Sequence, residues 1–437
     1  MFERCPSLTA CLVVATFGMQ ALLYSSPAIS AETAQLPFDP PIGSAAEWYK
    51  ADWVLMHTPG EELLFGLLHP EAGLFEDVFS IEEAGKEHRQ YMAILEQQGA
   101  RVVTVRDLLL RDTADPDGEG RRDLLSLAER AVTLDLSALK PEEADKQRTY
   151  FRDSLRKQSP ESLVRTIMLW PTIRLRVDPA AASASYNLTA IYEASPLMNL
   201  YFTRDQLITT AKGVVIGRMA RPQRLYETEV LRLVLKKLGV APLLEVQGEG
   251  RLEGGDFLPA GRRAFLGQGI RTNQQALEQL LTADAFGADE VIAVKDGWKQ
   301  QQEMHLDTYF NIADEGTAVL IQDRYDCAGS PKCLTADLWR RNGTGGYEKQ
   351  EEGVDFVRLL GRLGFTIIPV SVKDQALYGI NFLTIGRHKI IGVDGVSAEY
   401  KDALAQAGIE ATWIPFEHMK RGYGAAHCTT QVLRRAP

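Results

Sequence analysis

The chain has 437 residues, of which 45% are hydrophobic and 24% are charged, a composition typical of a folded globular protein rather than a disordered one. Its length allows one large domain or two to three ordinary ones. The formal net charge of -10 and the lack of a basic stripe argue against nucleic acid as a partner, because such binding depends on neutralising phosphates with Lys and Arg.

The N-terminal 31 residues have the pattern of a cleaved secretory signal. A weakly basic start precedes a largely apolar run from Leu8 to Tyr24, and small residues follow at 28–31. The apolar run is shorter than the ~20 residues of a membrane-spanning helix, which favours cleavage over an uncleaved anchor. We therefore predict a signal peptide over residues 1–31 and a secreted or periplasmic protein that has no membrane association after cleavage.

The next part of the chain predicts a strand and then a helical block. Trp53–Met56 is apolar and continues into His57-Thr58-Pro59-Gly60, which predicts a strand that ends in a turn. From about residue 81 to residue 173, helix-forming residues are mixed with acidic and basic ones, which predicts several helices. We interpret this block as a helical insertion that shapes or covers a site.

From about residue 197 onward, short apolar strands alternate with helices. Strands are predicted at 213–216, 264–266, 291–294, 317–321, 366–370 and 389–393, and helices at 226–238, 272–281, 354–363 and 398–407. This pattern is typical of an α/β fold built from repeated small units. No Gly-x-Gly-x-x-Gly opens a helix and no phosphate loop occurs, so no nucleotide cofactor is implied.

Removal of the signal would leave three cysteines, Cys327, Cys333 and Cys428. The first two flank a turn that contains Gly and Pro, and they could close a small disulfide loop in an oxidising compartment. Cys428 is then left over. Since a lone cysteine is usually a buried and inert small side chain, its neighbours decide its interpretation.

Four segments concentrate unusual polar groups, and two of them carry carboxylates. Residues 199–205 end in Arg204-Asp205 after an apolar stretch, which indicates either a surface ion pair of little energetic value or part of a site. Glu253 and Asp256 flank a Gly-Gly bend. Such a bend suits a tight turn that aims both carboxylates at one point, or simply a polar turn.

The other two segments contain histidines and the leftover cysteine. His305 and Asp307 are two residues apart, which in a strand places both on one face, as an acid–base pair or as a structural pair. Cys428 follows a loop of small residues, so its sulfur would be open to a ligand, and His427 or a nearby cation would favour the thiolate. No second Cys lies at ligand spacing and the His residues do not pair as zinc ligands do, so no metal site is expected.

The order of these motifs resembles the arginine deiminase family, within the guanidine-modifying superfamily. The matching motifs are Phe-Thr-Arg-Asp at 202–205, Glu-Gly-Gly-Asp at 253–256, His-Leu-Asp-Thr at 305–308, and a Gly-containing loop before Cys428. The resemblance implies an α/β fold, a pseudo-symmetric propeller of ββαβ modules with a helical insertion at about 81–173. It also implies one catalytic domain over residues 45–437, no cofactor, and a small guanidine as the partner, with L-arginine first; a homo-oligomer is left open.

The resemblance also assigns roles. Cys428 would attack the guanidinium carbon, while His305 would give a proton to the departing ammonia and take one from the attacking water. Asp205 and Asp307 would grip the planar guanidinium, and Glu253 would balance charge and protons beside the reacting carbon. The substrate-binding residues implied in the same way are Asn199, Arg224, Arg271 and Asp256, with the arginines expected at the α-carboxylate.

The loop before the nucleophile departs from the family pattern. Tyr423 stands where the family usually has an arginine, and Ala425 and Ala426 replace glycines, which predicts a stiffer and less positive loop. Hydrolysis of L-arginine to L-citrulline and ammonia is the first hypothesis. The alternatives are a deiminase of another guanidine or of peptidyl-arginine, an amidinotransferase, and a non-catalytic periplasmic arginine-binding protein. Binding alone would not require Cys428 or His305.

Overall fold

The computed structural model describes residues 41–178, 187–343 and 345–437. The predicted signal peptide over residues 1–31 lies outside this part of the chain. Among the described residues, no helix combines the length and the apolar character needed to cross a bilayer.

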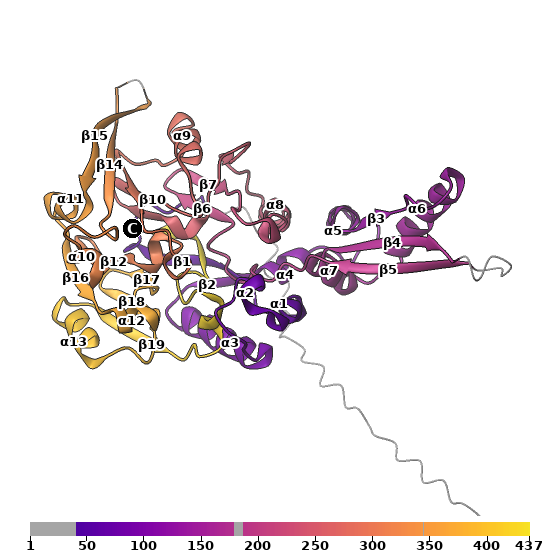
Figure 1. The fold of residues 1–437 in the computed structure, drawn as a ribbon, viewed down its shortest axis with the longest axis horizontal. Helices are drawn as coiled ribbons and strands as arrows, with labels where there is room; N and C mark the ends of the chain where they lie inside the picture. The colour runs from indigo at the N-terminus through magenta and orange to yellow at the C-terminus, as the bar shows by residue number, and fades with distance from the viewer. Residues whose placement is uncertain (1–40, 179–186, 344) are drawn as a thin grey trace, which may run out of the picture. The chain divides into compact units, whose positions relative to one another are not determined.

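Within the described ranges, five small sheets repeat one topology, so the fold is mixed α/β (Figure 1). In each sheet a middle strand pairs antiparallel with one neighbour and parallel with the other. One or more helices connect the parallel pair. These sheets are the ββαβ modules that the repeated small units of the sequence predicted.

The modules are numbered here by the position of their middle strand. Module 1 joins the two ends of the chain and consists of β20 (Gln431–Ala436), β1 (Lys50–Met56), α3 (Ile81–Gln97) and β2 (Arg101–Thr104). Module 2 consists of β6 (Leu207–Thr210), β7 (Gly213–Ile216), α8 (Glu227–Lys237) and β8 (Leu244–Glu245). Module 3 consists of β9 (Phe257–Ala260), β10 (Arg263–Gln268), α9 (Gln274–Thr282) and β11 (Glu290–Lys295).

The last two modules complete the repeat. Module 4 consists of β12 (Phe310–Asp314), β13 (Thr317–Ile321), α11 (Phe356–Arg362) and β16 (Thr366–Val370), and module 5 of β17 (Leu383–Gly386), β18 (Lys389–Val393), α13 (Ala398–Gln406) and β19 (Glu410–Ile414). The predicted strands at 317–321, 366–370 and 389–393 have the observed bounds. Short helical turns connect the elements: η2 (Glu61–Leu63), α1 (Leu64–Leu68), α2 (Pro70–Gly73), η4 (Pro222–Arg224), η5 (Gly254–Asp256), η6 (Gln301–Glu303), η7 (Leu306–Thr308), α12 (Val372–Ala376) and η8 (Met419–Gly422).

Local sequence explains why these elements form. The middle strands β13 and β18 are rich in β-branched residues and are buried along most of their length, as strands covered on both faces are. Polar side chains cap the connecting helices. Ser80 accepts the backbone N–H of Glu83 at the start of α3, and Ser397 accepts that of Tyr400 at the start of α13.

A separate segment, residues 105–194, follows β2 and is called the insertion segment below. Its elements are α4 (Val105–Leu110), α5 (Glu119–Ala131), β3 (Thr133–Asp135), α6 (Pro141–Arg156), α7 (Pro160–Leu169), β4 (Pro171–Val177) and β5 (Leu188–Ala194). The helices predicted in this region are present, together with a three-stranded sheet, β3-β4-β5, that the sequence did not predict. The predicted insertion began at residue 81, but α3 and β2 belong to module 1 because β2 pairs with β1.

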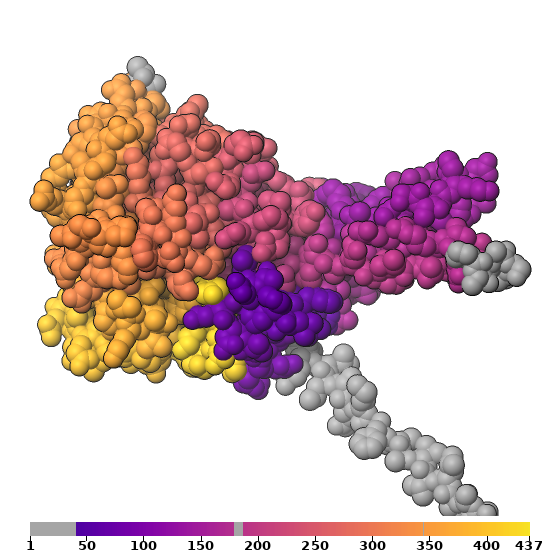
Figure 2. Space-filling model, viewed as in Figure 1, coloured from indigo at the N-terminus to yellow at the C-terminus, as the bar shows by residue number. Residues whose placement is uncertain are grey.

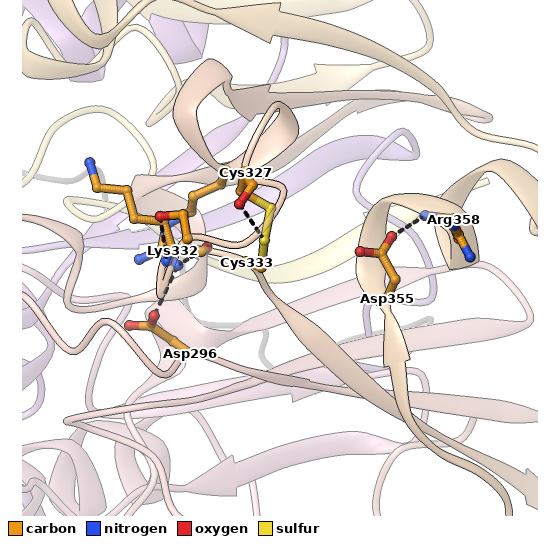
Figure 3. Close-up of a disulfide and its surroundings, with 8 residues drawn as sticks. Asp296, Cys327, Lys332, Cys333, Asp355 and Arg358 are labelled. Carbon is orange, nitrogen blue, oxygen red and sulfur yellow. Dashed lines mark hydrogen bonds and ion pairs between the residues drawn. A yellow bond between two sulfur atoms is a disulfide. The ribbon is translucent and has the colours of Figure 1, made fainter.

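A hairpin extends the sheet of module 3. Strands β14 (Thr335–Arg341) and β15 (Tyr347–Asp355) come between β13 and β16 in sequence, and β14 pairs antiparallel with β11. The turn that precedes the hairpin follows α10 (Gln322–Tyr325) and is closed by a disulfide between Cys327 and Cys333, with Cα atoms 5.2 Å apart (Figure 3).

Candidate active site

The predicted functional side chains lie just ahead of the first strand of a module. Asp205 precedes β6 by two residues, Glu253 precedes β9 by four, Asp307 precedes β12 by three, and Cys428 precedes β20 by three. The same edge of the repeated unit therefore presents a polar group each time. These segments are buried, so the groups meet away from bulk water.

Cys428 is the one free cysteine of the described residues, and it is buried. Its Sγ accepts a hydrogen bond from Asn381 Nδ2 at 3.1 Å and lies 3.5 Å from Asp307 Oδ2. Burial and the carboxylates of Asp307 and Asp205 raise the pKa of the thiol well above its ordinary value. The free protein therefore holds a protonated thiol beside an acceptor for its proton.

His305 is held between two carboxylates. Its Nε2 is 2.8 Å from Glu253 Oε2, and its Nδ1 is 3.7 Å from Asp205 Oδ1. Burial alone would lower the pKa of His305, but Asp205 and Glu253 raise it to about 9. The ring is therefore a cation at neutral pH and can give up a proton. A side chain at Gly255 would place its Cβ 2.7 Å from His305 Nδ1, which explains the Gly-Gly bend.

Glu253 is fully buried and surrounded by donors. Its Oε1 accepts the backbone N–H of Ala220 at 2.8 Å and lies 3.7 Å from Arg271 Nη1. Burial opposes ionisation, yet Arg271 and the hydrogen bond from His305 hold the pKa of this carboxyl well below its ordinary value. Glu253 is consequently a carboxylate that stabilises the charged ring of His305.

Asp307 is fixed by a chain of buried polar groups. His427 Nδ1 is 2.7 Å from Asp307 Oδ2, and His427 Nε2 is 3.8 Å from Glu47 Oε1, which is also paired with Arg435. Burial raises the pKa of Asp307, but the contact with His427 outweighs it and lowers the pKa. Asp307 Oδ1 has no hydrogen-bond partner within the described chain, so a strong acceptor remains free beside Cys428.

The two predicted binding arginines differ in how many of their donors are occupied. Arg224 donates to Asp205 Oδ2 at 2.8 Å and to Glu227 Oε2 at 2.9 Å. Arg271 donates through Nη2 to Gln301 Oε1 at 3.3 Å, while its buried Nε and Nη1 have no hydrogen-bond partner in the described part of the chain. Arg271 Nε is therefore free for a ligand, while its Nη1 lies 3.7 Å from Glu253 Oε1 and makes no hydrogen bond among the described residues. Arg224 mainly neutralises buried carboxylates.

Five of these groups, Cys428, His305, Asp205, Arg224 and Arg271, line one narrow pocket of about 10 Å³. Glu253 and Asp307 are not lining residues, but they contact His305 and Cys428. The pocket walls are formed by Leu74, Asn199, Phe202, Asp205, Arg224, Arg271, Gln301, Met304, His305, Gly422, Tyr423 and Cys428. Figure 2 shows why both chain ends contribute, since the indigo N-terminal residues lie directly against yellow C-terminal ones. The backbone N–H of Glu76 donates to the carbonyl of Arg421 at 2.6 Å across this boundary.

Comparison with known proteins assigns the family. The sequence profile described as "Arginine deiminase" matches residues 72–435. The chain belongs to the arginine deiminase family. It is 28% identical over 484 residues to the arginine deiminase of Halobacterium salinarum, covering 91% of this chain and 97% of that protein.

Solved structures share the fold of this arginine deiminase family member at low sequence identity. DDAH from Pseudomonas aeruginosa, a mutant complexed with citrulline, has a TM-score of 0.51 and 12% identity over 88% of this chain and 99% of that one. SxtG, an amidinotransferase from Microseira wollei in the saxitoxin biosynthetic pathway, has a TM-score of 0.50 and 15% identity over 91% of this chain and 98% of that one.

The structure corrects one prediction about the local geometry of this arginine deiminase family site. His305 and Asp307 do not lie on one face of a strand, because the chain after His305 forms the 3-10 turn η7. Asp256, predicted to bind substrate, is outside the pocket lining, as Glu253 and Asp307 are, and its buried Oδ2 has no hydrogen-bond partner in the described residues. Its Oδ1 accepts the backbone N–H of Leu306 at 2.9 Å, and burial raises its pKa to about 7. Asp256 therefore positions the turn that carries His305.

Asn199 and Tyr423 line the pocket as the sequence suggested, with additional constraints. The Asn199 side-chain amide donates to the backbone carbonyl of Gly73 at 3.0 Å, and the backbone carbonyl of Asn199 accepts from Arg224 Nη2 at 3.3 Å. Tyr423 has a left-handed backbone conformation with φ of 69°, which costs free energy for residues other than glycine. The tyrosine therefore places a half-buried ring at the wall where the family usually has an arginine.

Sequence reasoning missed Asn381. Its Nδ2 contacts Cys428 Sγ, and its Oδ1 accepts the backbone N–H groups of Ala425 at 3.0 Å and of Cys428 at 3.2 Å. One side chain thus fixes both the sulfur and the loop that carries it. The position was detectable, because Asn381 precedes β17 by two residues, as Asp205 precedes β6 in module 2.

One group of ligand atoms in the described residues could geometrically hold a metal, formed by Asp205, Glu253 and His305. The two carboxylates of this group already contact a cation, since Arg224 Nη1 lies 2.8 Å from Asp205 Oδ2 and 3.7 Å from Glu253 Oε2. A fixed guanidinium this close repels a metal cation. The arrangement is suited to a cationic substrate group with hydrogen-bond donors rather than to a bare ion.

Proposed function

We propose that the protein hydrolyses L-arginine to L-citrulline and ammonia through a covalent intermediate on Cys428. The observation that carries the proposal is that the thiol of Cys428, the cationic ring of His305 and a carboxylate of Asp205 line one narrow pocket in a chain of the arginine deiminase family. Nucleophile, acid and anion are the three groups that guanidine hydrolysis requires.

Binding of the substrate activates the thiol. Asp205 and Asp307 hold the proton on Cys428 in the free protein, because a thiolate between two carboxylates is unfavourable. A guanidinium that enters between them brings a compensating positive charge and presents N–H groups to the free oxygens, Asp205 Oδ1 and Asp307 Oδ1. The thiolate then forms only with the substrate in place, and the thiol proton passes to solvent.

The reaction proceeds in two halves. The Cys428 sulfur bonds to the guanidinium carbon, and the tetrahedral adduct expels ammonia, which takes a proton from His305. Water then adds to the carbon of the thiouronium while His305 removes one of its protons. The carbon–sulfur bond breaks as the remaining hydroxyl proton passes to the departing sulfur, which releases the ureido product and restores the thiol. Glu253 lowers the energy of the protonated His305 through their 2.8 Å contact.

Recognition of the amino-acid end depends on Arg271. Its buried Nε and Nη1 make no hydrogen bond among the described residues, and Gln301 holds Nη2. An α-carboxylate would satisfy these donors with bidentate geometry. The Arg224 guanidinium is placed to support Asp205 and Asn199 instead. Recognition of free L-arginine is therefore compatible with Tyr423 in place of the usual arginine.

The proposed catalytic domain covers residues 45–437, with the five modules arranged as a propeller-like ring around the pocket. The repeat of one ββαβ topology and the placement of a polar group ahead of the first strand in the modules support this arrangement. The secreted or periplasmic location is proposed on the N-terminal pattern and on the Cys327–Cys333 disulfide, which is typical of an oxidising compartment. Mass spectrometry of the non-reduced mature protein tests the signal cleavage and the disulfide together.

The function is tested by measuring ammonia and citrulline from purified mature protein with L-arginine, agmatine, methylated arginines and an arginyl peptide in parallel. Equal amounts of citrulline and ammonia from L-arginine, without an added amine, are expected. Turnover of another guanidine alone would contradict the L-arginine assignment but keep the chemistry. Product that forms only with an acceptor amine would indicate an amidinotransferase, and binding of L-arginine without turnover would indicate a binding protein.

A further inference from the structure

A second cleft lies in the insertion segment and shares no lining residue with the candidate active site. It encloses about 740 Å³ between the loop before α5, the first turns of α5, and the connection from α6 to α7. This volume is within the range of small-molecule pockets, roughly 300–1,000 Å³. Figure 1 shows α5, α6 and α7 gathered within this segment.

Four cationic side chains line the cleft, namely Arg121, Arg122, Arg156 and Lys157, against one carboxylate, Asp117. The chain carries more acidic than basic residues overall, 58 against 48, so this local excess of positive charge is unusual. Clustered cations repel one another unless an anion lies between them. The composition of the lining therefore points to an anionic ligand.

Arg121 supplies a second and independent observation. It is 6% exposed, and its Nη2 donates to the carbonyls of Arg156 and Gln158 at the end of α6. Its Nη1 is buried and has no hydrogen-bond partner among the described residues. Because a buried donor without a partner is unfavourable, this atom is suited to a ligand in the cleft.

The nearby carboxylates are engaged elsewhere. Lys236 pairs with Glu119 at 3.0 Å and with Asp123 at 2.7 Å, and Asp112 lies 3.4 Å from Arg111. Of the four lining cations, only Arg156 forms an ion pair within the described residues, an exposed contact with Asp153 at 3.3 Å. Most of the positive charge in the cleft thus remains available.

We propose that this cleft binds a phosphate group, as inorganic phosphate or as the phosphate monoester of a small molecule. Three guanidinium groups and one ammonium group match the charge of a phosphate dianion and its several acceptor oxygens better than they match a single carboxylate. The described lining contains no aromatic side chain on which a nucleobase would stack, so the site favours a compact phosphate compound over a nucleic acid.

The test is calorimetric titration of the mature protein with inorganic phosphate and, separately, with glycerol phosphate at constant ionic strength. One phosphate is expected to bind per chain, and binding is expected to raise the melting temperature. The double variant R122A/K157A removes two exposed cations that hold no structural hydrogen bond to α6, and it should weaken binding at least about tenfold. The tighter of the two probes identifies the source of the phosphate.

The matched control is K140A/K146A, which removes two exposed cations of the same segment outside the cleft and should bind phosphate as the wild type does. No heat of binding and no rise in melting temperature with either probe up to about 10 mM, or equal binding by R122A/K157A and wild type, would overturn the proposal. Arginine turnover serves as the folding control, because neither variant touches the candidate active site.

Discussion

Ionic side chains are arranged in opposite ways in the candidate active site and in the insertion segment. In the site, Arg224 contacts Asp205 with both side chains at most 4% exposed. In the insertion segment, Arg152 contacts Glu129 at 2.7 Å, but the two side chains are 58% and 47% exposed. Water and salt screen the second pair, whereas nothing screens the first.

The difference teaches where charge is used for chemistry in this fold. Buried charges shift one another's pKa, as Asp205 and Glu253 do for His305, and they fix geometry because separating them is costly. Exposed pairs contribute little to stability because water and salt screen them. Variants in the two regions test this contrast.

Removal of the nucleophile should have the largest effect. Cys428→Ser should reduce citrulline formation by about four orders of magnitude or more, since the covalent path is lost. The near-identical size of the side chain should leave the circular dichroism spectrum and melting temperature close to those of the wild type. Retention of more than a few per cent of the activity would rule out the proposed mechanism.

A matched pair of substitutions compares the two kinds of ion pair directly. Arg224→Met leaves Asp205 and Glu227 buried without their cation and should cost roughly 3–5 kcal/mol of unfolding free energy. Arg152→Met removes an exposed pair and should cost at most about 1 kcal/mol. Urea unfolding measures both. Equal losses in the two variants would show that burial does not set the difference.

The pH dependence of His305 tests its electrostatic environment. Its pKa is raised to about 9 in the folded protein, so its contribution to stability is fully present below its ordinary pKa, near 6.5, and is lost as the pH rises through about 9. Glu253→Gln should lower the pKa of His305 by about 2 units, since a carboxylate contact at 2.8 Å loses its charge.

Nuclear magnetic resonance titration of the imidazole protons measures that shift, with the His305 signal assigned from a His305→Gln spectrum. Glu315→Gln is the control, because Glu315 and its partner Arg387 are both more than half exposed, and neither contributes to the raised pKa of His305. An unchanged His305 pKa in Glu253→Gln would mean that this carboxylate does not hold the proton.

The smallest expected effect concerns Asn381. Asn381→Ser removes the N–H that contacts Cys428 Sγ and should lower kcat by about tenfold, the value of one hydrogen bond to a charged group. The same change should raise the pKa of the thiol, measured by the pH dependence of alkylation. Asn311→Ser is the matched control, since this buried amide donates to the carbonyls of Ile380 and Phe382 and accepts the backbone N–H of Ile312, with no hydrogen bond to Cys428 in the described residues. Equal effects would assign Asn381 a merely structural role.

Sequence patterns alone predicted the repeated units and most of the residues that the proposed chemistry uses. Local sequence was enough to predict the buried strands at 317–321 and 389–393, because short runs rich in β-branched residues and bounded by turns favour strands. The ordered motifs identified Cys428, His305 and the three carboxylates that meet around them.

The hydrogen-bond partners of those residues became known only from the tertiary structure. Asp256 accepts a backbone N–H, and Asn381 from another module contacts the sulfur. Arg224 is bound to carboxylates, whereas Arg271 Nε makes no hydrogen bond among the described residues. These outcomes depend on which strand ends meet in space. Sequence spacing sets the direction of a side chain along its own segment, but the partner that satisfies a buried polar group comes from a distant one.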